Sequence, residues 1–155
     1  MAAVAGASVT LRHSLVSHNT AARRGGGISA GSSSTIVLHN CTLQHNSAGA
    51  FTGCSSSAVG LGSAASLLVC GGGGMFLGGA SATMHSSALQ YNTVTQGHGG
   101  GVLGVGLGSL HVQGSRVQSN HAGGRGGGLA LLTDAGNTAV PPSRIIIGPT
   151  SVQGV

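Results

Sequence analysis

The chain has 155 residues and a net charge of +5, and 31 of its residues are glycine. So much glycine is typical of a disordered segment unless it recurs at a fixed spacing, so the fold class depends on periodicity. Asp134 is the only acidic residue and lysine is absent, which excludes paired-carboxylate catalysis, carboxylate-built calcium or magnesium sites, and lysine chemistry within this chain.

Two sequence markers recur along the chain with one spacing. The first is an apolar residue three places before an asparagine, in the quartets VSHN (16–19), LQHN (43–46), LQYN (89–92) and VQSN (117–120). The second is a block of three glycines followed by an apolar residue, and these blocks begin at Gly25, Gly72, Gly99 and Gly126. Both markers recur about every 27 residues, with one longer interval in the middle, which indicates an internal repeat.

Within each repeat, short strands are expected at fixed places relative to the asparagine. Apolar residues stand ten and eight positions before it, namely Val9 and Leu11, Ile36 and Leu38, Ala82 and Met84, and Leu110 and Val112. This alternation is typical of a half-buried strand. Turn positions follow at His13, Asn40, Ser86 and Gly114. A second short strand is expected to end at the asparagine, and a third to begin after each glycine block.

The end of the chain repeats the pattern in a weaker form. Ile145, Ile147, Pro149 and Val152 fall ten, eight, six and three positions before Val155, which takes the place of the asparagine. We therefore expect 1–155 to be a single segment of a longer array. Two stretches, 51–70 and 134–142, exceed the repeat length and are expected to be loops. For 51–70 the alternative is an additional coil with residues 67–69 as its strand.

A repeat of this length cannot bury an apolar face alone, so the repeats must stack in register. The sequence therefore predicts an all-β fold, a single-stranded parallel β-helix of about five coils with three short strands each. Stacking would align Asn19, Asn46, Asn92 and Asn120 into a ladder of side-chain hydrogen bonds, and the alternative is four separate turn residues. The glycine blocks would form tight turns where side chains would collide. Their residues are Gly25, Gly26, Gly27, Gly72, Gly73, Gly74, Gly99, Gly100, Gly101, Gly126, Gly127 and Gly128.

These motifs resemble a known repeat. The blocks GGGI (25–28), GGGM (72–75), GGGV (99–102) and GGGL (126–129), with the asparagine quartets, are similar to the two halves of the polymorphic outer-membrane protein repeat, although leucine or valine stands where its F-x-x-N half has phenylalanine. The resemblance covers nearly the whole chain and implies the right-handed parallel β-helix of the pectin-lyase-like fold group. It also implies a secreted or surface protein, in a group where many members are adhesive and others cleave or bind polysaccharides.

Three cysteines and one asparagine are candidates for covalent modification. Cys54 and Cys70 bracket the 51–70 insertion, and a disulfide between them would require an oxidising compartment, the alternative being free thiols. Cys41 occupies a position that is small in every repeat, so a buried thiol is expected there. Asn40 begins the only N-x-S/T triplet and lies on a predicted turn, which makes it a candidate glycosylation site.

Eight histidines are candidate ligands: His13, His18, His39, His45, His85, His98, His111 and His121. The repeat register pairs His18 with His45 and His39 with His85, and stacked imidazoles could bind Zn²⁺ or Cu²⁺. No third ligand of fixed spacing accompanies them, so no metal is predicted. Outward-facing polar positions that gain positive charge at acidic pH are the preferred interpretation.

Other functional classes are not expected. The glycine blocks lack the helix N-terminus that phosphate-binding loops use, so no cofactor or catalytic residue is predicted. Three aromatic residues give no platform for stacking bases, so nucleic acid is not an expected partner. No apolar stretch reaches the roughly 18 residues of a transmembrane helix.

The sequence therefore favours a non-enzymatic repeat scaffold, extracellular or at a cell surface. Its expected partners are glycans or cell-surface proteins, together with neighbouring coils of a longer protein. The alternative is part of a polysaccharide-active enzyme whose acidic catalytic cluster lies outside this chain.

Overall fold

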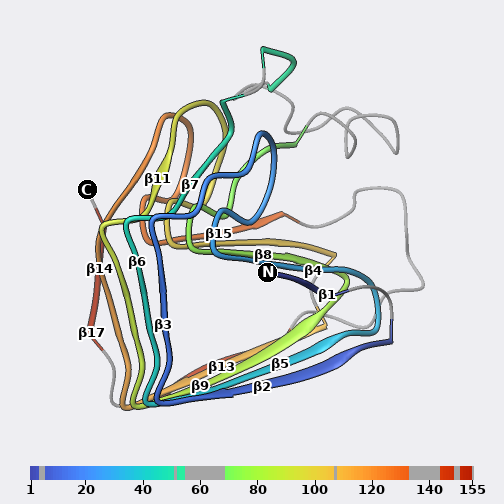
Figure 1. Cartoon of the computed structure of the whole chain (residues 1–155), viewed down its shortest axis with the longest axis vertical. Coiled ribbons are helices and arrows are strands. Elements are labelled where there is room, and N and C mark those ends of the chain that lie inside the picture. Colours follow the sequence, from blue (N-terminus) through green and yellow to red (C-terminus); the bar gives the residue numbers. More distant parts are fainter. Residues whose placement is uncertain are drawn as a thin grey trace.

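The computed structural model describes residues 1–3, 6–50, 52–54, 69–106, 108–132, 144–148 and 151–154. All regular elements in these ranges are β-strands, which confirms the all-β class predicted from the sequence. The strands form three parallel sheets that border a roughly triangular outline in Figure 1. Within the described ranges, no helix is long and apolar enough to cross a membrane.

Each repeat contributes strands to all three sheets in the same order. The first sheet contains β1 (Ala2–Ala3), β4 (Ile28–Ala30), β8 (Met75–Gly78), β12 (Val102–Val105) and β15 (Leu129–Leu132). The second contains β2 (Ser8–Arg12), β5 (Thr35–His39), β9 (Ser81–His85), β13 (Ser109–Gln113) and β16 (Arg144–Ile147). The third contains β3 (Leu15–Ser17), β6 (Thr42–Gln44), β7 (Ser47–Ala48), β10 (Ala88–Gln90), β11 (Thr93–Val94), β14 (Arg116–Ala122) and β17 (Ser151–Gly154).

Strands pair with the equivalent strand of the neighbouring repeat, so equivalent residues lie side by side. One row of the second sheet consists of Val9, Ile36, Ala82, Leu110 and Ile145. One row of the third sheet consists of Val16, Leu43, Leu89, Val117 and Val152. The residue columns counted back from each asparagine in the sequence coincide with these rows. The repeat period therefore specifies the strand register.

The 51–70 insertion does not interrupt this stacking. Strand β4 pairs directly with β8, and β5 pairs directly with β9, although the insertion separates them in the sequence. The inserted residues therefore add no strand between these neighbours, which favours the loop over an additional coil. Most of the insertion and all of 134–142 lie outside the described residues.

Two details differ from the sequence-based expectation. The strand expected to end at the asparagine stops earlier, at Gln44 in β6 and at Gln90 in β10. The next residue in each repeat, His45 or Tyr91, has a positive φ of 52° or 54°, which breaks the extended backbone. Strands β7 and β11 then follow the asparagine, so these repeats have four strand segments instead of three.

The second difference concerns the end of the chain. Asn120 pairs with Gly154 after a register shift, and not with Val155 as the residue count predicted. Val117 still pairs with Val152, so β17 has one residue fewer than β14 between the two pairs. Val155 itself lies outside the described residues.

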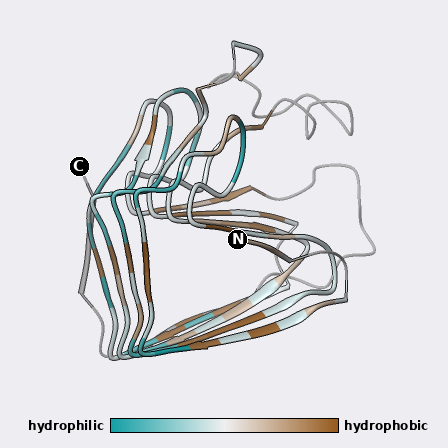
Figure 2. Ribbon diagram, in the orientation of Figure 1, coloured by the Kyte–Doolittle hydropathy of each residue, from teal (hydrophilic) through white to brown (hydrophobic). Residues whose placement is uncertain are grey.

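Apolar side chains from the three sheets meet in one interior cluster. Fully buried members include Met75 from the first sheet, Ile36 and Met84 from the second, and Leu43 and Leu89 from the third. Burying one such side chain stabilises a fold by about 1.5–3 kcal/mol. In Figure 2 the apolar segments recur at matching places on neighbouring strands. The interior is therefore built from like residues stacked on like.

A smaller apolar cluster lies on the opposite face of the first sheet. Phe76, Leu103 and Ala130 share one row there, and Val69 packs against them. The Arg24 guanidinium carbon lies 5.0 Å from the centre of the Phe76 ring, and Arg24 Nε donates to the Val69 carbonyl at 2.7 Å. Val69, near the end of the 51–70 insertion, and Arg24 therefore cover this outer face.

The glycine blocks meet two separate backbone requirements. The first glycine of a block, such as Gly72 with a φ of 68°, has a left-handed conformation that other residues adopt only at a cost. The later glycines lie where neighbouring repeats come close together. A Cβ on Gly74, for example, would lie 2.8 Å from the carbonyl oxygen of Gly101. Both requirements concern the stacking of the backbone and not a ligand.

Candidate functional site

The four repeat asparagines form a continuous hydrogen-bonded column. Asn19, Asn46 and Asn92 each donate from Nδ2 to Oδ1 of the next asparagine, at 3.0, 3.0 and 2.9 Å. Their backbone N–H groups donate to the same oxygens at 3.1, 3.0 and 2.9 Å. Asn46, Asn92 and Asn120 are buried, and each also donates to a carbonyl of the preceding repeat. The three buried asparagines therefore use their amide donors within the protein, and Asn19 is the one member of the column that is exposed.

The cysteines and Asn40 occupy three different environments. Cys54 and Cys70 form a disulfide across the insertion, and closing a loop of this length contributes about 3 kcal/mol in the chain-entropy picture. Cys41 is free and buried, and its N–H donates to Ser87 Oγ at 3.1 Å. Asn40 is exposed on a turn with a φ of 51°. A glycan on Asn40 would therefore meet no interior packing.

Two rows of polar side chains run side by side along the outer face of the third sheet. In the glutamine row, Gln90 Nε2 donates to Gln44 Oε1 at 3.0 Å, and Gln118 Nε2 donates to Gln90 Oε1 at 3.3 Å. In the ring row, the next residue of each repeat stacks on its neighbour. The ring centres of His18 and His45 are 5.1 Å apart, and those of His45 and Tyr91 are 5.3 Å apart.

The ring row is exposed because of its backbone conformation. His18, His45 and Tyr91 all have positive φ, between 52° and 56°, so the chain bulges outward between two strand segments. All three side chains are exposed, and Tyr91 retains 47% of its surface. Serine stands at the equivalent place in the next repeat, Ser119. This face therefore presents a hydrogen-bonded row of amides beside a stacked row of rings.

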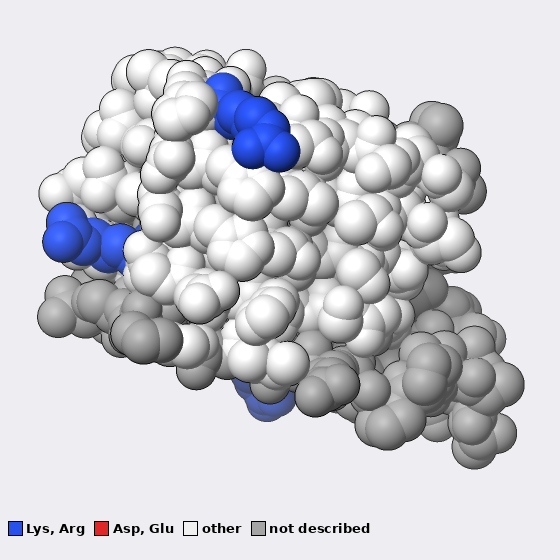
Figure 3. Space-filling view, turned by 90° about the horizontal axis from the view of Figure 1, so that it is seen from below, with Lys and Arg blue, Asp and Glu red and all other residues white. Residues whose placement is uncertain are grey.

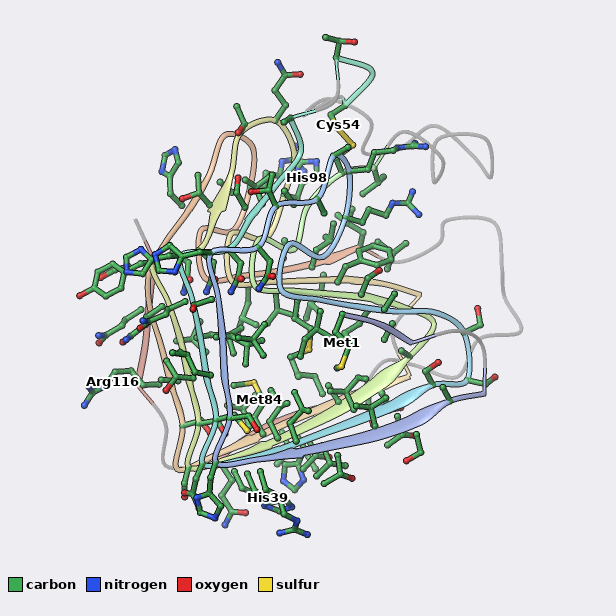
Figure 4. The ribbon with its side chains drawn as sticks, in the orientation of Figure 1. Met1, His39, Cys54, Met84, His98 and Arg116 are labelled. Atoms are coloured by element: carbon green, nitrogen blue, oxygen red, sulfur yellow. A yellow bond between two sulfur atoms is a disulfide. The ribbon has the colours of Figure 1, made fainter. Side chains whose placement is uncertain are left out.

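A second histidine row lies on the outer face of the second sheet. The rings of His39 and His85 stack with centres 5.0 Å apart, and His111 meets His85 edge-on at 6.4 Å. In Figure 4, His39 points away from the interior while Met84, from the neighbouring strand, points into it. Desolvation, with Arg12, His85 and His13 nearby, lowers the pKa of His39. The imidazole of His39 is therefore harder to protonate than a free histidine.

His98 departs from the outward orientation expected for the histidines. Its side chain is completely buried, and its Nδ1 accepts a hydrogen bond from the backbone N–H of Arg125 at 3.1 Å. Its Nε2 is buried without a hydrogen-bond partner among the described residues. The Nδ1 acceptor requires the neutral ring with its proton on Nε2. Burial, and secondarily the charge of Arg125, lowers the pKa of His98.

This burial predicts a loss of stability in acid. The unfolded chain takes up a proton on His98 near the ordinary pKa of 6.5, whereas the folded chain takes it up only at a lower pH. The free energy of unfolding is therefore expected to fall as the pH drops below about 6.5, by up to about 1.4 kcal/mol per pH unit for this group. His39 acts in the same direction because its pKa is also lowered.

The variant His98→Asn tests this prediction, because the asparagine oxygen can replace Nδ1 as the acceptor without titrating. Urea unfolding between about pH 5 and pH 7 is expected to show a shallower pH dependence for the variant. His121→Asn, at an exposed position, is the matched control and should leave the dependence unchanged. An unchanged slope in His98→Asn would contradict the assignment.

The described surface carries cationic side chains without acidic ones. Figure 3 views the molecule from the side of the second sheet and shows separate arginines but no acidic residue. Asp134 lies outside the described residues. In the described ranges, no group of three His, Cys, Asp or Glu side chains is placed to hold a metal ion. The charged side chains of this described surface therefore favour an anion over a cation as a ligand.

Sequence reasoning singled out some of these residues and missed others. It paired His18 with His45 and His39 with His85, but it did not extend the ring row to Tyr91. It also overlooked the glutamine row, although glutamine precedes the ring position in three repeats, in LQHN, LQYN and VQSN. A column-by-column reading of the outward positions would have found both. It would not have found the contact of His111 with His85, because His111 pairs in register with Thr83.

The fold and the surface define this chain as an all-β protein of stacked sequence repeats with ordered rows of side chains on its outer faces. Comparison with protein-family models, with curated proteins and with solved structures gives no match for it. Its function is therefore argued from the chemistry of those rows.

Proposed function

We propose that this chain forms a right-handed parallel β-helix and acts as a non-enzymatic scaffold, secreted or at a cell surface, that contacts glycans. The β-helix is supported by the order in which every repeat visits the three parallel sheets. The handedness and the location rest on the resemblance of the repeats to the polymorphic outer-membrane protein repeat. The non-enzymatic role is supported by a composition with a single acidic residue.

The observation that carries the glycan proposal is the glutamine row beside the ring row. Gln90 uses one N–H and one oxygen lone pair on its two glutamine neighbours, so a second N–H and a second lone pair are left for a ligand. Sugar hydroxyls both donate and accept hydrogen bonds, and the row offers both along Gln44, Gln90 and Gln118. Because the strands lie about 4.8 Å apart, the row suits a chain of sugar units better than a single small molecule.

Tyr91 provides a direct reporter for this surface. It is the only tyrosine and the chain has no tryptophan, so the intrinsic emission of the protein reports on the ring row. Titration with a panel of soluble polysaccharides is expected to change this emission for at least one class of glycan. If none does, the assignment of glycan contact to this third-sheet surface is wrong.

A variant pair then locates the contact. Gln90→Ala removes the central amide and is expected to weaken binding about tenfold, which corresponds to the loss of one or two hydrogen bonds. Gln96→Ala removes an exposed glutamine that lies outside the three sheets and should leave the affinity unchanged. Equal weakening by both variants would contradict the proposed surface. Formation of a cleavage product from the bound polysaccharide would contradict the non-enzymatic role.

A further inference from the structure

The outer face of the second sheet gathers ionisable groups of one sign. Strand β5 contributes His39, β9 contributes His85 and β13 contributes His111, in the stacked and edge-on contacts described above. Strand β2 contributes Arg12, which pairs in register with His39, and His13 follows it in the turn. Arg144 of β16 pairs in register with Ser109. No carboxylate of the described residues faces this group.

The row becomes strongly cationic only when protons are added. At neutral pH its permanent charge is that of Arg12, because imidazoles are largely neutral above about pH 6.5. In acid, each protonated imidazole stands about one strand spacing from the next, and the like charges repel one another. Desolvation, and after it the nearby charges of Arg12, His85 and His13, lowers the pKa of His39. An anion lying along the row would relieve the repulsion.

The neighbouring outward rows are rich in hydroxyl groups. One row of the second sheet consists of Ser8, Thr35, Ser81 and Ser109. Thr10 and Thr83 belong to the row that lies between the Ser8 row and the His39 row. Thr10 is exposed and Thr83 is half-buried. Apart from the histidines, β2, β5, β9 and β13 carry no aromatic residue or large exposed apolar side chain among the described residues, while Ile146 of β16 is exposed and pairs in register with His111. The hydroxyl rows suit the hydroxyl groups of a sugar, and base stacking on the imidazoles is the competing outcome that a nucleic-acid probe tests.

From this arrangement we propose that the face formed by β2, β5, β9 and β13 binds an acidic polysaccharide, sulfated or carboxylated, and binds it more tightly as its histidines become protonated. The inference rests on the proposed glycan-binding function and adds the ligand charge, the face and the pH dependence. The anionic groups would lie along the imidazole row beside Arg12. The sugar hydroxyls would meet the serine and threonine row.

Linkage makes the pH dependence reciprocal. If protonation strengthens anion binding, then bound anion must raise the proton affinity of the imidazoles by the same factor. A single charge-assisted hydrogen bond contributes enough for about a tenfold change in affinity. Two or more histidines acting together are therefore expected to give at least that change between about pH 7.5 and pH 5.5.

Dextran sulfate and uncharged dextran form a matched pair of probes, because they share a backbone and differ in charge. Binding of dextran sulfate, measured by calorimetry, is expected to tighten at least about tenfold from pH 7.5 to pH 5.5 and to weaken with added salt. Dextran should show no such change. Circular dichroism at both pH values establishes that the fold is intact. An affinity for dextran sulfate that does not depend on pH would overturn the inference.

A second stacked histidine pair serves as the control for which face produces the pH dependence. His39→Gln combined with His85→Gln is expected to remove most of the pH dependence. His18→Gln combined with His45→Gln removes the other stacked pair, on the third sheet, and should remove little of it. Equal effects of the two double variants would show that total charge and not this face determines binding. Tighter binding of single-stranded DNA than of dextran sulfate would also overturn the inference.

The outcomes separate this inference from the proposed function. If His39→Gln with His85→Gln leaves the pH dependence intact while polysaccharides still change Tyr91 emission, the inference alone is wrong. If no polysaccharide changes that emission, yet the pH-dependent binding of dextran sulfate is lost in the same double variant, the third-sheet surface is wrong and this face stands.

Discussion

Replacing Asn92 by alanine is expected to lower the free energy of unfolding by about 4 kcal/mol, because it leaves two buried donors of Asn46 without their acceptor. Asn92 is completely buried. Its Oδ1 accepts from both the backbone N–H and the Nδ2 of Asn46, each at 3.0 Å. Leaving a buried donor without an acceptor costs about 1–3 kcal/mol, and the alanine would strand two of them.

Two further variants separate hydrogen bonding from packing. Asn92→Asp keeps the shape and the acceptor but cannot donate to Leu43 and Asn120 as Nδ2 does at 3.0 and 2.9 Å. It also buries a carboxylate against two oxygens, so it is expected to be strongly destabilising at neutral pH. Asn19→Ala, at the exposed end of the column, should cost less than about 1 kcal/mol. Urea unfolding followed by circular dichroism measures all three. Wild-type stability in Asn92→Asp would mean that the column acts only by filling space.

The repeat spacing predicts those parts of the fold that depend on like residues lying on like. The rows through Ile36 and Leu43, and the column through Asn46, follow from counting, because one period brings the same residue type to the same place in each repeat. Stacked repeats are then stabilised because equivalent residues bury one another in a common core and form the same hydrogen bonds in each repeat. This is why strand register, usually difficult to derive from sequence, was accessible here.

The features that the sequence did not predict lie at positions where the repeats do not share one residue type. His98 aligns with Gly71, and Gly71 with Arg24, through isolated bridges, so no common residue type marks this position as buried. The outward bulge was missed for a different reason. His45 and Tyr91 adopt the left-handed backbone region, for which histidine is a weaker signal than glycine and tyrosine is none. In both cases the repeat imposes a burial or a backbone conformation that the residue type at that position does not indicate.

Rows on the outer faces could be predicted less well than the interior for a related reason. Burial penalises every departure from an apolar residue, so the inner rows stay uniform. An outward row tolerates substitution, and thus the ring row passes from His45 to Tyr91 and then to Ser119. The rows that persist outside, such as Gln44, Gln90 and Gln118, are therefore more informative about function than the uniform rows inside.

Replacing Gly73 by alanine is expected to destabilise the fold by about 4 kcal/mol or more, because the added methyl group would meet only backbone. Its Cβ would lie 2.5 Å from the carbonyl oxygen of Gly100 and 2.7 Å from that of Thr93. Neither atom can turn aside, so neighbouring repeats would have to separate. Separation would break the bond from Gly73 N–H to the Gly99 carbonyl and the bond from Gly27 N–H to the Gly73 carbonyl, both 3.2 Å. Costs of this size arise from few mechanisms, and overpacking is one of them.

Two glycines provide graded controls for the same chemical change. A Cβ on Gly148 would lie 3.5 Å from the nearest atom, a side-chain carbon of Gln113, so Gly148→Ala should shift stability by less than about 1 kcal/mol. A Cβ on Gly78 would lie 2.9 Å from the Phe76 ring, which can rotate, so Gly78→Ala should fall between the two. If Gly73→Ala does not fold, resistance to proteolysis still ranks the three variants. A Gly73→Ala protein as stable as Gly148→Ala would contradict the close approach of the glycine blocks, because only backbone contact distinguishes the two sites.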